Sequence, residues 1–244
     1  MAKKKRAFEF EFPAAVLSLS AADRKLGRFM ELAGPCGLQL DDAESPFESL
    51  VEAIVYQQLN GSAAETIFNR VKAIFAPERF PSPRLLLEVP DERLRGAGLS
   101  RQKIAAIRDL AAKTLDGTVP DLRAIRRMSD DEIIERLTSV RGVGRWTVEM
   151  FLIFHLGRPD VLPIGDYGVL QGYALTHRKR KLPKPKQLGA FGERWKPYRS
   201  VASWYMWRAV HLDRAKKAAD SKKKSEKMAA EKDKKKGRRK PTKD

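Results

Sequence analysis

The stretch that decides the fold is residues 137–168, LTSVRGVGRWTVEMFLIFHLGRPDVLPIGDYG. It predicts the end of one helix, a glycine hairpin, a second and very apolar helix, and then a lone carboxylate, Asp166, after a Pro-Gly turn. The hairpin is suited to holding a phosphate group. The carboxylate follows about twenty residues later, where the chain can fold it back beside whatever the hairpin holds.

The hairpin consists of Gly142, Val143 and Gly144. Two glycines allow a tight turn and a close backbone approach to a ligand. The helix that begins at Arg145 presents free N–H groups, Thr147 included, and its positive dipole end to a phosphate oxygen. The alternative is a plain helical corner with glycine at a C-cap. We favour phosphate binding, and the carbonyl groups near Val140 and Gly142 could also hold a monovalent cation such as Na⁺ or K⁺.

Three polar residues follow the hairpin. Glu149 and His155 interrupt an otherwise apolar helix, and we expect both to be structural, Glu149 as the partner of a nearby arginine. Asp166 occupies an N-cap position before the next helix, where a negative charge is favoured. Capping and a catalytic role are compatible, because such a carboxylate can stabilise a developing cation.

Charge is concentrated at the two ends of the chain. The 244 residues carry a formal net charge of +18, of which residues 1–6 contribute +4 and residues 214–244 contribute +10. Such a balance favours a polyanionic partner, most simply nucleic acid. The single cysteine, Cys36, excludes a disulfide framework and a four-cysteine metal or iron–sulfur site. No apolar run is long enough to span a bilayer, and no signal peptide is present.

Helix signals dominate the body of the chain. Capping patterns at Ser45, Ser62, Ser100 and Ser129 precede apolar residues at helical spacing. Only AFEFEF at residues 7–12 alternates like a strand, and it is too short to found a sheet. Residues 177–199 are basic and broken by prolines, which predicts a surface connector. We therefore expect an all-α, two-lobed helical bundle with a helix-hairpin-helix motif and a basic disordered C-terminal tail.

The expected organisation has four parts. Residues 1–44 form an N-terminal helical segment that packs with the C-terminal helices. Residues 45–156 form a helical lobe that ends in the hairpin motif, and residues 157–213 carry the Asp166 turn and the last helices. Residues 214–244 are rich in lysine, have almost no apolar side chains and should be disordered.

Several motifs taken together resemble the helix-hairpin-helix superfamily of DNA glycosylases. They are GVGRWT and LPIGD in the stretch above, EAIVYQQLNGSAAE (52–65), GLSRQKIAAI (98–107) and RWKPYRSVASWYMWRA (194–209). The resemblance covers about residues 45–212 and is to the alkylpurine branch, the 3-methyladenine DNA glycosylase II type. It implies base excision repair by cleavage of the N-glycosidic bond, with Asp166 as the catalytic aspartate.

The resemblance also assigns the rest of the site. It places the base pocket at Trp146, Met150 and Trp207, although Met150 stands where the best-known members have an aromatic residue. It places the wedge that fills the gap left by the flipped base at Gln58, Leu59 and Asn60. Bifunctional members carry a lysine where this chain has Trp146, so we expect a monofunctional enzyme that leaves an abasic site. No cofactor is implied beyond the hairpin cation.

The expected partner is double-stranded DNA with damaged bases. We expect the protein to be a monomer without membrane contact. Its expected location is the cytoplasm, in association with the nucleoid, or the nucleus if the source is eukaryotic. A cationic alkylated purine leaves without protonation, so one carboxylate suffices. Two other readings stay open: a non-catalytic helix-hairpin-helix protein that binds DNA, and a glycosylase of the same fold for deaminated or mismatched bases.

Overall fold

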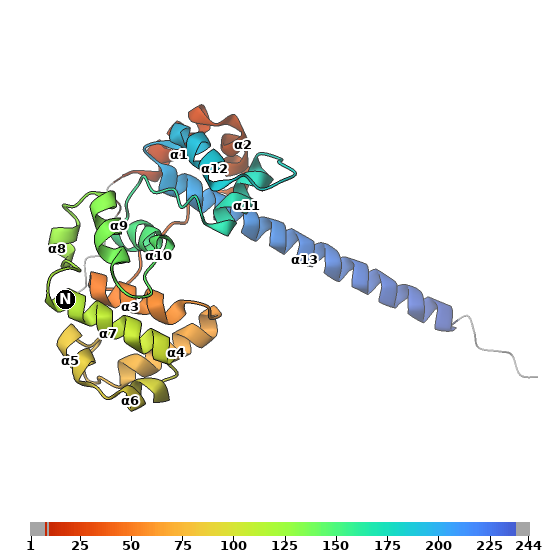
Figure 1. The fold of residues 1–244 in the computed structure, drawn as a ribbon. Coiled ribbons are helices and arrows are strands. Elements are labelled where there is room, and N and C mark those ends of the chain that lie inside the picture. Colours follow the sequence, from red (N-terminus) through yellow and green to blue (C-terminus); the bar gives the residue numbers. More distant parts are fainter. Residues whose placement is uncertain (1–7, 9, 238–244) are drawn as a thin grey trace, which may run out of the picture.

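The computed structural model describes residues 8 and 10–237, and in this part of the chain every regular element is a helix. Figure 1 shows two groups of helices and one long helix that leaves the body. Residues 7 and 9 of the strand-like AFEFEF segment lie outside the described residues. Its phenylalanines Phe8, Phe10 and Phe12 pack edge to face, and Phe12 begins the first helix.

The helices of the first group follow one another in the chain. It consists of α3 (Pro46–Tyr56), α4 (Gly61–Ala73), α5 (Pro83–Glu88), α6 (Asp91–Gly96), α7 (Arg101–Leu115), α8 (Leu122–Ile125), α9 (Asp130–Thr138), α10 (Arg145–Met150) and the π-helix η1 (Phe151–Leu156). They enclose one apolar core that contains Ile54, Leu110 and Leu152.

The second group joins the two ends of the chain. It consists of α1 (Phe12–Ala22), α2 (Arg24–Ala33), α11 (Tyr167–Thr176), α12 (Pro185–Gly192), the 3₁₀-helix η2 (Glu193–Trp195) and α13 (Arg199–Gly237). Leu19 and Leu26 from the N-terminal helices share a core with Leu188, Trp195 and Met206. No helix among the described residues is long and apolar enough to cross a membrane.

Three of the four predicted helix starts are confirmed. Ser45, Ser100 and Ser129 are N-caps that accept backbone N–H groups, and Ser129 forms a full capping box with Glu132. The start predicted at Ser62 is wrong, because α4 begins two residues earlier. Its N-cap is Asn60, which accepts hydrogen bonds from the backbone of Ala63 and from the Ser62 hydroxyl.

The surface connector predicted at residues 177–199 is only partly confirmed. Residues 178–182 are exposed, but Pro185 opens α12 instead of breaking a helix. A proline at the first position of a helix is favourable, since its missing N–H has no partner there. Trp195 is then fully buried, so this segment contributes to the second core.

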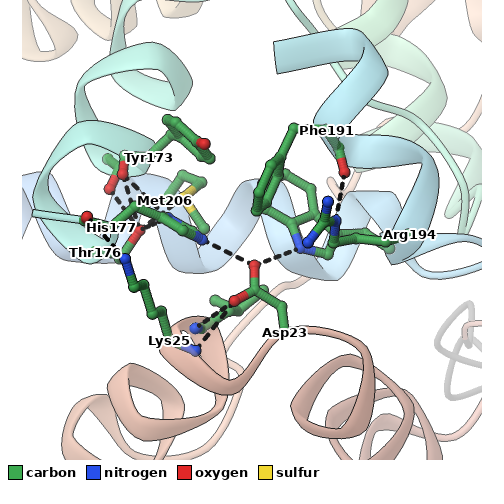
Figure 2. A network of polar contacts seen from close by, with 11 residues as sticks. Asp23, Lys25, Tyr173, Thr176, His177, Phe191, Arg194 and Met206 are labelled. Atoms are coloured by element: carbon green, nitrogen blue, oxygen red, sulfur yellow. Dashed lines mark hydrogen bonds and ion pairs between the residues drawn. The ribbon is translucent and has the colours of Figure 1, made fainter. Parts of the chain in front are cut away.

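A buried polar network fixes α11 to the N-terminal helices. Asp23 caps α2 and accepts hydrogen bonds at Oδ2 from His177 Nε2 at 2.9 Å and Trp195 Nε1 at 3.0 Å (Figure 2). Burial raises the pKa of the Asp23 carboxyl, but the hydrogen bonds from His177, the Leu26 N–H and Trp195 lower it overall, to about 2. The carboxylate therefore joins three elements distant in sequence.

The C-terminal segment differs from its predicted disorder. The structure continues α13 as a helix through Gly237, and the tail prediction for residues 238–244 lies outside the described residues. Residues 214–236 contain no glycine or proline and are rich in Lys and Ala, which have high helix propensity. Asp213 and Lys217 lie one turn apart and form an ion pair with 2.8 Å between the charged atoms, which further stabilises the helix.

Candidate active site

Asp166 lies at the N-terminus of α11 and accepts three hydrogen bonds. Its Oδ1 accepts from the Val169 backbone N–H and from Trp207 Nε1, both at 2.8 Å. Its Oδ2 accepts from Trp146 Nε1 at 2.7 Å. The expected N-cap is thus confirmed, and the same carboxylate is held between two indole rings that come from α10 and α13.

Aromatic side chains lie around Asp166. Trp146 is 51% exposed, whereas Trp207 is half-buried and stacks on Phe154, with 5.7 Å between ring centroids. Met150 is half-buried and packs against the first core. The sequence reasoning missed Phe154, although its position four residues after Met150 on an apolar helix was a signal.

Two glycines of α11 allow the close approach of α13. A Cβ on Gly168 would lie 2.8 Å from Trp207 Cδ1 and 3.1 Å from Asp166 Oδ1. A Cβ on Gly172 would lie 2.1 Å from the backbone oxygen of Met206. The two helices therefore touch backbone to backbone, and this contact brings Trp207 within hydrogen-bond distance of Asp166.

The glycine hairpin has the predicted position between α9 and α10. Gly142 has a φ of +77°, which favours glycine, and Gly144 is the N-cap of α10 without a side-chain cap. Val143 is buried and fixes the turn to the first core. Gly142, Gly144 and Arg145 are exposed, whereas Thr147 is buried. The first N–H groups of α10 have no partner within the helix, so they are available to an anion.

The Asp109 carboxylate on α7 stabilises the segment that leads into the hairpin. Asp109 Oδ2 accepts hydrogen bonds from the Arg141 backbone N–H at 2.7 Å and from Lys113 Nζ at 2.9 Å. Burial raises the pKa of Asp109, but these two hydrogen bonds lower it below its ordinary value. Lys113 also donates to the Ser139 carbonyl, so the segment that leads into the hairpin is fixed to α7 at two points.

The carbonyl groups of the hairpin already have protein partners. Val140 accepts from the Val143 N–H at 3.0 Å, and Gly142 accepts from Gln57 Nε2 at 3.0 Å. A carbonyl oxygen has two lone pairs, so a monovalent cation at this place stays a prediction. Among the described residues, no cluster of His, Cys, Asp and Glu has the composition of a metal site.

The predicted wedge residues lie in the turn between α3 and α4. Gln58, Leu59 and Asn60 are all exposed, and Gln58 has a φ of +57°. Asn60 is committed to capping α4, which leaves Gln58 and Leu59 as the side chains free to project.

Two further residues fix this turn. Gln57 joins it to the hairpin through the Gly142 carbonyl. Lys103 Nζ donates to the carbonyl groups of Val55 at 2.6 Å and Gln57 at 2.8 Å. Burial lowers the pKa of Lys103.

Glu149 and His155 are structural, as expected. Glu149 is buried and accepts from Arg145 Nε at 3.0 Å, while burial raises the pKa of its carboxyl. His155 is fully buried, and its Nδ1 lies 2.8 Å from Asp41 Oδ1.

Comparisons with known proteins agree with this geometry. The family model described as "HhH-GPD superfamily base excision DNA repair protein" matches residues 51–197. The DNA-3-methyladenine glycosylase 1 of Schizosaccharomyces pombe is 37% identical over 199 residues, which cover 81% of this chain and 87% of that protein.

Two solved structures share the fold. One is the S. pombe 3-methyladenine DNA glycosylase in complex with abasic DNA, which is 37% identical with a TM-score of 0.70 and covers 80% of this chain and 95% of its own. The other is a DNA-3-methyladenine glycosidase from Bacillus halodurans, which is 35% identical with a TM-score of 0.74 and covers 85% of this chain and 92% of its own.

Proposed function

The chain belongs to the HhH-GPD superfamily of base excision DNA repair proteins, in the branch of the 3-methyladenine DNA glycosylases, and we propose that it excises alkylated purines with Asp166 as its catalytic carboxylate. The observation that carries this proposal is the position of Asp166, held between the indoles of Trp146 and Trp207 at the N-terminus of α11. A protein that only binds DNA has no need of this arrangement.

The reaction breaks the bond between C1′ of the sugar and the purine nitrogen. The base leaves with the electron pair of this bond, and a cationic alkylated purine thereby becomes neutral without an external proton. Positive charge develops on the sugar, and the Asp166 carboxylate stabilises it. A water molecule then adds its oxygen to C1′ and releases a proton, which leaves an abasic site.

The base pocket explains why a cationic purine is favoured. The reactive bond is reached only when the nucleotide is flipped out of the stack. The exposed ring of Trp146 and the half-buried ring of Trp207 offer faces on which an electron-poor base stacks, and their π-systems attract its charge. The half-buried Met150 adds a polarisable contact.

We propose that the protein is monofunctional. The position of the Schiff-base lysine in bifunctional relatives is Trp146, which donates to Asp166 instead. Lys103, a half-buried lysine near the wedge turn, donates to two backbone carbonyl groups. Neither Trp146 nor Lys103 supplies a free amine at C1′ of the sugar. Without such an amine no Schiff base forms, so the backbone of the DNA stays intact.

The DNA-binding residues take separate roles in this proposal. The backbone of Gly142, Val143, Gly144 and Arg145, with the Thr147 N–H, binds a phosphate group, and a Na⁺ or K⁺ ion at the Val140 and Gly142 carbonyls would bridge to the same strand. Gln58 or Leu59 fills the gap left by the flipped base. The protein acts as a monomer on chromosomal DNA, in the nucleoid or, in a eukaryote, in the nucleus.

The test is release of free base from duplexes that each carry one lesion. We expect release of 3-methyladenine, and loss of release by at least about 100-fold in Asp166→Asn, with binding to an abasic duplex retained. Asp131→Asn, an exposed aspartate at the start of α9, is the matched control. Release of only deaminated or mismatched bases would change the substrate, and binding without any release would overturn the enzyme assignment.

A further inference from the structure

A single helix, α13, begins in the catalytic core and ends far outside it. It carries Trp207, which donates to Asp166 at 2.8 Å, and it continues without a break to Gly237. Figure 1 shows its second half projecting from the body. At 1.5 Å per residue, the thirty residues after Trp207 extend about 45 Å.

The projecting part, residues 214–237, is strongly cationic. It contains eleven Lys and Arg against four Asp and Glu, and every residue from 214 to 226 is exposed. Arg214, Lys216, Lys217 and Lys222 point in different directions around a helix of 3.6 residues per turn. This distribution contrasts with the first three turns of α13, where Val201, Tyr205 and Met206 are buried in the second core.

The chemistry of this segment identifies its partner. Packing against a partner helix or insertion into a lipid interface would require an apolar stripe, which a helix charged all round does not have. A polyanion requires only exposed positive charge, and duplex DNA carries one phosphate for every 1.7 Å of its axis. Residues 214–237 extend about 36 Å and therefore span about 21 phosphate charges.

We infer that residues 214–237, the basic arm, bind the DNA duplex on one side of the lesion as a contact surface separate from the hairpin and the wedge turn. This inference rests on the proposed function, because the flipped nucleotide must place its C1′ at Asp166. The duplex then continues on both sides of that point. The helix leaves the body in one direction from Trp207, so the arm reaches only one of the two flanks.

The experiment uses two duplexes with one abasic site each. The site lies close to one end of the first duplex and close to the opposite end of the second, so each duplex has one long flank, on opposite sides of the lesion. The full-length protein is compared with the triple variant Lys222→Gln, Lys223→Gln, Lys224→Gln, in which glutamine preserves helix propensity. We expect the variant to lose affinity about tenfold on one duplex and less than about twofold on the other. The slope of log affinity against log salt should fall by about 2–3 units on the first duplex alone.

The matched control removes three charges elsewhere. Lys179, Lys181 and Lys186 are exposed between the end of α11 and the first turn of α12, and their change to glutamine should not reproduce the difference between the two duplexes. The opposite change, Asp220→Asn with Glu226→Gln, should strengthen binding on the affected duplex several-fold. Equal losses on both duplexes, or the same pattern in the control, would overturn the inference.

A further variant tests the rigidity of the arm. Ala218→Pro leaves the charge unchanged but breaks the helix between Asp213 and Lys222, so it should abolish most of the difference between the duplexes. A difference that survives Ala218→Pro would overturn the rigid arm. Base release at saturating protein is measured separately and should be unchanged in all arm variants, so a failure of the proposed function is distinguishable from a failure of this inference.

Discussion

The side-chain amide of Gln57 donates a hydrogen bond from Nε2 to the carbonyl oxygen of Gly142, with 3.0 Å between the two atoms. The two residues are far apart in sequence, and each belongs to one of the two loops that we propose to contact DNA. The hydrogen bond therefore couples the wedge turn to the phosphate-binding hairpin. Lys103 supports the same turn from α7 through the Val55 and Gln57 carbonyl groups.

Loss of this coupling should weaken the engagement of damaged DNA. We expect Gln57→Met, which keeps the size of the side chain but removes the donor, to lower single-turnover base release about 5- to 10-fold, the value of one hydrogen bond. Thermal unfolding should change little because Gln57 is on the surface turn. Gln102→Met, at an exposed position of α7, is the control and should behave like the parent protein.

The two indole N–H groups should contribute separately to the reaction. Trp146→Phe and Trp207→Phe each keep an aromatic face but remove one donor to Asp166. A hydrogen bond to a charged group is worth about 1.5–3 kcal/mol, so each variant should slow base release about 10- to 100-fold in single-turnover kinetics. Trp204→Phe, which alters a ring packed on Tyr205, should leave the rate unchanged, and a rate loss there equal to the others would contradict this role.

The space at Gly168 should be essential to the site. In Gly168→Ala the new Cβ would lie 2.8 Å from Trp207 Cδ1, so the indole must move away from Asp166. We expect the rate of base release to fall at least about tenfold, because the Trp207 hydrogen bond to the charged Asp166 carboxylate would be lost. Gly165→Ala is the neighbouring control, because nothing lies within 4 Å of its Cβ position. Equal activity of both variants would show that the Trp207 contact is dispensable.

Borohydride should not trap the protein on damaged DNA. Trapping needs a Schiff base between a lysine amine and C1′, and Trp146 occupies the place of that lysine. The measurement is electrophoresis of the protein after incubation with a lesion-bearing duplex and borohydride, with a bifunctional glycosylase as the positive control. A covalent adduct that maps to a lysine of this chain would contradict the monofunctional mechanism.

The Asp23 network should make stability depend on acidic pH. The pKa of Asp23 is about 2 in the folded protein, below the value of about 3.9 in an unfolded chain. A lowered pKa stabilises the folded state above pH 4, by about 2–3 kcal/mol, and this contribution is lost as the pH falls from 4 towards 2. In urea unfolding, the free energy of unfolding of Asp23→Asn should therefore be well below that of the parent protein at pH 7 and close to it near pH 2. A difference in stability that does not depend on pH would contradict the assignment.

The sequence alone determined the local features of this protein. The caps at Ser45, Ser100 and Ser129, the hairpin from Gly142 to Gly144 and the N-cap at Asp166 all depend on neighbouring residues, so the pattern of side chains specifies them. The resemblance of several ordered motifs also identified the family. The Ser62 error has the same local origin, because Asn60 competes for the same role two residues earlier.

Only the tertiary structure decided which of these features meet. Trp146 lies on α10, Asp166 caps α11 and Trp207 lies on α13. The contact of Gly172 with the Met206 backbone brings the last two together, and the packing of α10 adds Trp146. Trp195 is buried because Asp23, from the other end of the chain, accepts its N–H group. Such contacts depend on packing between distant segments, which no local spacing encodes, and for that reason the Gln57 bridge and the direction of α13 could be seen only in the folded molecule.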